Sequence, residues 1–169
     1  NASQVMATLS GLAGDFVVTT AGPDLEGIIA GKGAGAHMVS KETGKTVANL
    51  DIGGGTTNIA VFRGGEVIDT CCLDIGGRLM MLSEDGSKVQ YIAPKLKQLS
   101  METGTDIAQG MGAAIQQLRS ITQRMSGILE EVLGIAAKSP KLEYMLTTRD
   151  LRRDYNIDCV SFSGGVADY

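Results

Sequence analysis

A carboxylate, three consecutive glycines and two hydroxyls follow one another along one short segment, as Asp51, Gly53, Gly54, Gly55, Thr56 and Thr57. Glycine has no Cβ, so consecutive glycines can leave backbone N–H groups open to an anion such as phosphate. A carboxylate beside a phosphate requires a cation between them, and Mg²⁺ with its retained waters is the usual one. The segment therefore predicts a phosphate-binding turn, with a plain glycine-rich hairpin turn as the alternative.

Two other glycine clusters do not match known phosphate-binding motifs. Gly44-Lys45-Thr46 ends like a P-loop, but Val39 stands where the first glycine is required, and a predicted strand follows instead of a helix. The cluster at 31–35 lacks the GxGxxG spacing and follows a predicted helix instead of a strand. The turn at 53–55 is therefore the candidate phosphate site.

Strands must position this turn on both sides. Runs of apolar and β-branched residues predict strands over 46–52, 56–63 and 66–73, separated by short glycine turns. Such short turns favour an antiparallel three-strand meander. Further strands are expected over 88–93 and 158–163, and the latter is followed by Gly164-Gly165.

Helices are expected on either side of these strands. Apolar residues at spacings of three and four predict one long helix over 105–133, marked by Ile107, Met111, Ile115, Leu118, Ile121, Met125, Ile128 and Val132. Shorter helices are predicted over 2–13, from Pro23 to the glycines at 31–35, at 78–81 and over 141–147, with a strand over 15–20. The chain is thus expected to be an α/β protein with a mixed sheet flanked by helices.

Composition excludes several classes of function. The 169 residues carry 15 basic and 19 acidic side chains, a net charge of −4, which argues against a nucleic-acid partner. No stretch approaches the ~20 apolar residues of a membrane span, and no leader peptide is visible. The chain begins with Asn and stops inside a motif, so we expect a fragment of a longer protein.

The residue types of common hydrolases and metalloenzymes are sparse. Cys71, Cys72 and Cys159 show no CxxC spacing and are expected to be buried in a reducing compartment. His37 has no partner for a triad or a metal site nearby. A basic cluster at Arg149, Arg152 and Arg153 is interpreted as a solvated face.

The segment DIGGGTTNIAVF at 51–62 resembles the second phosphate motif of the actin, hexokinase and heat-shock-chaperone ATPase superfamily. Ser163-Gly164-Gly165-Val166 resembles the adenosine motif of that superfamily. Across nearly the whole chain the sequence resembles the EutA family of ethanolamine ammonia-lyase reactivating factors, most clearly at 14–18, 21–23, 25–26, 29–31, 33–36, 72–73 and 76–79. The resemblance is weakest over 87–105 and 138–156.

The resemblance implies an RNase H-like, actin-like fold with two lobes and a nucleotide in the cleft between them. Residues 1–44 would be the C-terminal part of the first lobe, and 45–169 most of a truncated second lobe. Asp51 would be the catalytic residue and would hold Mg²⁺ through water. Residues 53–57 would bind the β- and γ-phosphates, and Gly164, Gly165 and Val166 would lie on the adenosine side.

The same resemblance implies an ATP-dependent chaperone, with ATP and Mg as cofactors, that frees damaged cobalamin from ethanolamine ammonia-lyase. It would work in the cytoplasm, where candidate sites include the bacterial microcompartments with which the ethanolamine enzymes are associated. Neither nucleic acid nor a membrane is expected as a partner. Because the first phosphate motif is absent and Asn58 replaces an aspartate of the heat-shock relatives, this chain alone is expected to have negligible ATPase activity.

Two alternatives remain open at the level of sequence. The first is an adaptor that keeps the actin-like fold and binds the lyase or another protein without hydrolysing nucleotide. The second is a sugar or acyl kinase of the same superfamily, although no residue of the chain suggests itself as the catalytic base.

Overall fold

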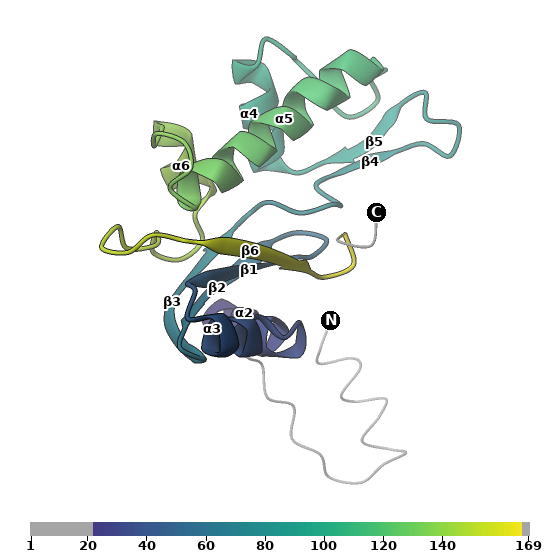
Figure 1. Ribbon diagram of the computed structural model, residues 1–169. Helices are drawn as coiled ribbons and strands as arrows, with labels where there is room; N and C mark the ends of the chain where they lie inside the picture. The colour runs from purple at the N-terminus through teal and green to yellow at the C-terminus, as the bar shows by residue number, and fades with distance from the viewer. Residues whose placement is uncertain (1–21, 167–169) are drawn as a thin grey trace, which may run out of the picture.

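The computed structural model describes residues 22–166, in which a single four-stranded sheet lies between two layers of helices (Figure 1). The predicted helix over 2–13 and strand over 15–20 lie outside the described residues. In chain order the elements are α2 (Pro23–Gly33), α3 (Ala36–Thr43), β1 (Val47–Ile52), β2 (Thr57–Arg63), β3 (Glu66–Leu73), β4 (Met80–Leu82), β5 (Val89–Ile92), α4 (Pro94–Glu102), α5 (Ile115–Val132), α6 (Pro140–Met145) and β6 (Cys159–Ser163).

The main sheet has the strand order β3-β2-β1-β6. β1, β2 and β3 form an antiparallel meander, and β6 pairs with β1 in parallel. Gly64 and Gly65 form the tight turn between β2 and β3, and both have the positive φ that such a two-residue hairpin turn requires. The predicted mixed sheet with its three-strand meander is confirmed.

One face of the sheet is covered by α2 and α3 (Figure 1). The glycines Gly27 and Gly31 allow α2 to lie close to the strands, because a Cβ on Gly31 would stand 2.6 Å from the ring of Phe62. These helices therefore pack on the sheet formed by residues 45–169. The assignment of residues 1–44 to a first lobe stays a prediction.

The other face of the sheet carries the larger core. Leu50, Ile59 and Val61 of the strands belong to one buried cluster with Ile121 and Ile128 of α5. The β4–β5 hairpin lies at one end of α5, and α6 lies at the other (Figure 1). The apolar stripe of α5 thus holds the helix on the sheet through burial of apolar surface.

The predicted long helix over 105–133 is wrong in its first third, because α5 begins only at Ile115. Within residues 105–114, Gly110 and Met111 pair with β5 instead: Val89 donates a backbone hydrogen bond to Met111, and Gly110 donates one to Val89. Gly110 has φ +86°, which is incompatible with a helix. The predicted helix at 78–81 is also wrong, since Met80–Leu82 form β4.

The cysteines contribute to packing. Cys71 and Cys72 are buried, and burial raises the pKa of both thiols. Cys159 is half-buried. Raised thiol pKa values keep Cys71 and Cys72 protonated and unreactive. Among the described residues, no helix is both long and apolar enough to cross a membrane.

Arg149, Arg152 and Arg153 are exposed, as a solvated face requires, but Arg149 and Arg152 also reach a buried carboxylate. Both contact Asp69 of β3, whose side chain is fully buried, and Arg149 Nη2 lies 2.6 Å from Asp69 Oδ1. The backbone N–H of Arg152 and the hydroxyl of Tyr155 each donate to Asp69 Oδ2 at 2.8 Å. This carboxylate therefore anchors the segment that leads into β6.

Burial alone would raise the pKa of Asp69, but the hydrogen bonds from Arg152 and Tyr155 and the Arg149 guanidinium outweigh it and hold the pKa below its ordinary value. A depressed folded-state pKa gives stability that is present above the unfolded-state pKa of about 3.9. That stability is lost as the pH falls through the folded-state pKa.

Asp69→Asn is expected to lower the free energy of unfolding at pH 7 by about 1–3 kcal/mol, because hydrogen bonds to a charged acceptor are lost. The difference from the wild type should shrink at pH 3. Urea unfolding at both pH values measures it. Asp154→Asn is the control, since this exposed carboxylate also pairs with Arg152 and should matter by less than about 1 kcal/mol. Equal effects of the two changes would contradict the anchoring role.

Candidate functional site

The loop between β1 and β2 carries the predicted phosphate-binding glycines. The N–H of Gly53 donates to the carbonyl of Thr56 at 2.9 Å and closes the turn. The N–H groups of Gly54 and Gly55 donate to no acceptor in the described part of the chain. Of the three N–H groups expected to face an anion, Gly53 therefore shapes the loop, and Gly54 and Gly55 are open donors.

A second glycine loop, at residues 76–78, lies directly on the first. Gly77 and Arg78 donate backbone hydrogen bonds to the carbonyls of Gly53 and Gly54, at 3.0 and 2.7 Å. A Cβ on Gly76 would stand 2.6 Å from the carbonyl carbon and oxygen of Gly54, so no side chain fits there. This loop was not predicted to be part of the site, and the one signal in the sequence was its adjacent pair of glycines before an arginine.

A third loop, at residues 164–166, approaches from the end of β6. Gly164 has φ +89°, and a Cβ there would stand 2.4 Å from the carbonyl oxygen of Ile52. The N–H of Val166 donates to that same oxygen at 3.3 Å. A Cβ on Gly77 would stand 2.6 Å from Val166 Cγ2. The second and third loops therefore also meet.

The three loops enclose a hollow of about 510 Å³, lined by Gly53, Gly54, Gly77, Arg78, Gly165 and Val166. The predicted phosphate and adenosine residues are thus brought together in part. Gly55 and Thr56 belong to the first loop but do not line this hollow. Thr57 is turned away: it is buried, and its hydroxyl donates to the carbonyl of Ile75 at 2.7 Å. The geometry gives Thr57 a structural role and no contact with an anion.

Asp51 lies next to the hollow at the end of a chain of polar side chains between β1 and β6. Ser161 Oγ donates to Asn49 Oδ1, and Asn49 Nδ2 donates to Ser163 Oγ, both at 2.9 Å. Ser163 Oγ in turn donates to Asp51 Oδ1 at 3.1 Å. Asn49 and Ser163 were not predicted as orienting residues, although alternating polar residues in an apolar strand were a signal.

The Asp51 carboxylate lies beside the third loop but does not line the hollow. A Cβ on Gly164 would stand 2.9 Å from Asp51 Oδ1, so the carboxylate borders the third loop. Its Oδ2 accepts no hydrogen bond from the described residues. Within residues 22–166, no group of three or more His, Cys, Asp and Glu side chains is placed to hold a metal ion. Any divalent cation here would therefore rely on water and on the ligand's own oxygens.

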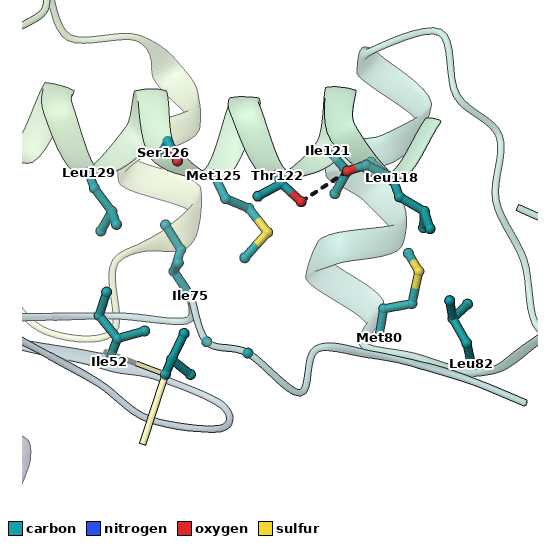
Figure 2. A pocket seen from close by; sticks show the side chains of 13 residues that line it. Ile52, Ile75, Met80, Leu82, Leu118, Ile121, Thr122, Met125, Ser126 and Leu129 are labelled. Atoms are coloured by element: carbon teal, nitrogen blue, oxygen red, sulfur yellow. Dashed lines mark hydrogen bonds between the residues drawn. The ribbon is translucent and has the colours of Figure 1, made fainter. Parts of the chain in front are cut away.

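An apolar pocket of about 350 Å³ adjoins the hollow between the sheet and α5 (Figure 2). It shares Gly77 and Val166 with the hollow. Figure 2 shows Ile52 and Ile75 pointing into it from the sheet side, opposite Met125 of α5. A polar, glycine-lined hollow and an apolar pocket therefore meet at two shared residues.

Comparison with known proteins identifies relatives of the whole chain. The sequence model of the family described as "Ethanolamine utilisation protein EutA" matches residues 1–169. Two curated relatives, each named ethanolamine ammonia-lyase reactivase EutA, come from Salmonella typhimurium and Escherichia coli. They are each 39% identical over 170 and 172 residues, which is 99% of this chain. The chain spans 36% of the length of each relative.

Among solved structures, the chain is similar to the Aquifex aeolicus member of the Ppx/GppA protein family. The sequence identity is 20% and the TM-score is 0.40, over 83% of this chain and 35% of that one.

Gly164→Ala is expected to lower the free energy of unfolding by about 1–3 kcal/mol, because it adds a Cβ at φ +89° against the Ile52 carbonyl. Gly165→Ala is the matched control, since a Cβ there has no atom within 4 Å and its φ is not positive. Chemical denaturation of both variants measures the difference. Equal stability of the two would show that the third loop does not contact β1 as described.

Proposed function

The chain belongs to the EutA family, and we propose that it is the central part of an ethanolamine ammonia-lyase reactivase that binds Mg-ATP where its three glycine loops meet. The observation that carries this proposal is the convergence of residues 53–55, 76–78 and 164–166 on one hollow. Glycine-rich loops with open N–H groups suit a phosphate chain.

Each predicted site residue except Thr57 keeps a role in this proposal. Gly54 donates its backbone N–H to the phosphates within the hollow, and the N–H of Gly55 and the hydroxyl of Thr56 bind phosphate oxygens that extend beyond its lining. Asp51, oriented by Ser163, accepts hydrogen bonds from the water shell of Mg²⁺. Gly164 and Gly165 lie along the ribose and α-phosphate.

The apolar pocket gives the nucleotide base a place. Its lining of aliphatic and methionine side chains excludes water from the faces of a flat ring (Figure 2). Because pocket and hollow share Gly77 and Val166, one ligand can extend from the first into the second. A nucleotide has a flat base joined to a charged phosphate chain, and this matches an apolar pocket that leads into a polar hollow.

The proposed partner is ethanolamine ammonia-lyase, and the proposed outcome is release of damaged cobalamin so that intact cofactor can bind. ATP hydrolysis would supply the free energy for that release. We propose that the reaction takes place in the cytoplasm or a bacterial microcompartment and needs the full-length protein, with an actin-like second lobe formed largely by 45–169. This chain alone would turn over little ATP, because phosphoryl transfer depends on several positioned elements.

Asp51→Asn in the full-length protein is expected to lower the rate of lyase reactivation by Mg-ATP about tenfold or more, because the water shell of the metal loses its anionic acceptor. The assay follows ethanolamine deamination by lyase that was first blocked with a cobalamin lacking the adenosyl group. Asp106→Asn is the matched control, since this carboxylate is exposed and far along the chain from the three loops. The control should reactivate the lyase at the wild-type rate.

The adaptor alternative makes the opposite prediction for the same pair of variants. If Asp51→Asn rescues the lyase as well as the wild type does, and calorimetry detects no binding of Mg-ATP or Mg-ADP to the full-length protein, the glycine loops are an inherited scaffold. The proposal of a nucleotide-dependent reactivase would then be wrong.

A further inference from the structure

Arg78 is the one charged residue among those that line the hollow in the described structure. Its backbone N–H is fixed by the hydrogen bond to the Gly54 carbonyl. The aliphatic part of its side chain lies over Gly54: Cδ is 3.3 Å and Cβ 3.7 Å from the position that a Cβ on Gly54 would take. Because Gly54 has no side chain, the aliphatic part of Arg78 can lie directly against the backbone of the first loop.

The guanidinium of Arg78 has no ion-pair partner among the described residues. The ion pairs of the chain engage Arg124, Arg149, Arg152 and Arg153 as well as Lys95, Lys138 and Lys141, but not Arg78. Arg78 is exposed at the hollow. A chain of net charge −4 thus presents an uncompensated positive charge beside the open N–H groups of Gly54 and Gly55.

We propose that Arg78 binds the phosphates beyond the α-phosphate and makes the site selective for nucleoside di- and triphosphates over monophosphates. The proposal rests on the nucleotide site proposed above. A base in the apolar pocket would reach the hollow at Gly77 and Val166, which line both spaces, whereas Gly54 and Arg78 line the hollow alone. Arg78, with its aliphatic stem on Gly54, therefore lies where the ligand extends out of the pocket, which is where the phosphates beyond the first would be.

The chemistry of the side chain supports this selectivity. A guanidinium donates two parallel hydrogen bonds to one phosphate group, whereas an ammonium acts as a point charge. Neutral N–H groups alone would discriminate weakly between one phosphate and three. A permanent cation next to them adds attraction for each further negative oxygen.

The test is calorimetric titration of Mg-ATP, Mg-ADP and AMP into the full-length protein and its Arg78→Gln variant. We expect Arg78→Gln to weaken Mg-ATP and Mg-ADP binding by roughly 10- to 100-fold and AMP binding by less than about threefold. Arg78→Lys should recover part of the affinity for Mg-ATP. Lys88→Gln is the matched control, because it also removes one exposed positive charge, and should leave all three affinities unchanged.

A second measurement needs no variant. Phenylglyoxal modifies exposed arginines, and mass spectrometry of the wild-type protein reports the modification of Arg78. Mg-ATP and Mg-ADP should protect Arg78 several-fold, and AMP should protect it little.

The outcomes separate this inference from the proposed function. If the wild type binds Mg-ATP and Arg78→Gln binds it equally well, or if Mg-ATP leaves Arg78 unprotected, the role of Arg78 is overturned while the nucleotide site stands. If AMP affinity falls as far as ATP affinity in a variant that unfolds at the wild-type temperature, the selectivity is overturned. If the wild type binds no nucleotide, the proposed function itself fails.

Discussion

The structure of the site depends on backbone lying against backbone at Gly76 and Gly54. Two peptide segments approach so closely that a Cβ on Gly76 would overlap the Gly54 carbonyl, and two hydrogen bonds hold them together. Only glycine allows this contact, because every other residue would separate the loops. The hollow, the exposed N–H groups and the path of Arg78 all follow from it.

The polar chain from Ser161 to Asp51 shows how the sheet serves the same site. Asn49 is fully buried, and both polar atoms of its side-chain amide are hydrogen-bonded to serines of β6. A buried amide with unsatisfied groups would be costly, so this pairing also selects the register of β1 against β6. Strand pairing and the orientation of the Asp51 carboxylate are therefore set by the same hydrogen bonds.

Local patterns in the sequence correctly predicted the features that depend on residues close together in the chain. The meander followed from β-branched runs and from glycine turns such as Gly64-Gly65. The start of α5 was not predicted correctly. Ile107 lies in a loop but is buried, and its position matches the helical spacing of the apolar residues that follow it. The contacts of Arg149 and Arg152 were missed because their partner, Asp69, lies about 80 residues earlier in the sequence.

For the candidate site, the sequence indicated Asp51 and two of the three glycine loops, since their residue types are unusual in themselves. It did not reveal that Gly76–Arg78 completes the hollow, because that depends on a contact between separate loops. Nor did it show that Thr57 is buried with its hydroxyl bound to the Ile75 carbonyl. Thr56 precedes β2 and is half-buried, whereas Thr57 is the first residue of the strand.

β6 lies at the edge of the sheet and has β1 as its one strand neighbour among the described residues. Its outward backbone groups are open to pairing, and Phe162 is 58% exposed. The third glycine loop directly follows this strand. A segment that pairs with the outer edge of β6 would therefore contact the strand next to Ser163 and Gly164 without contacting the hollow. A strand that paired with this edge would therefore also fix the backbone from which the third glycine loop continues.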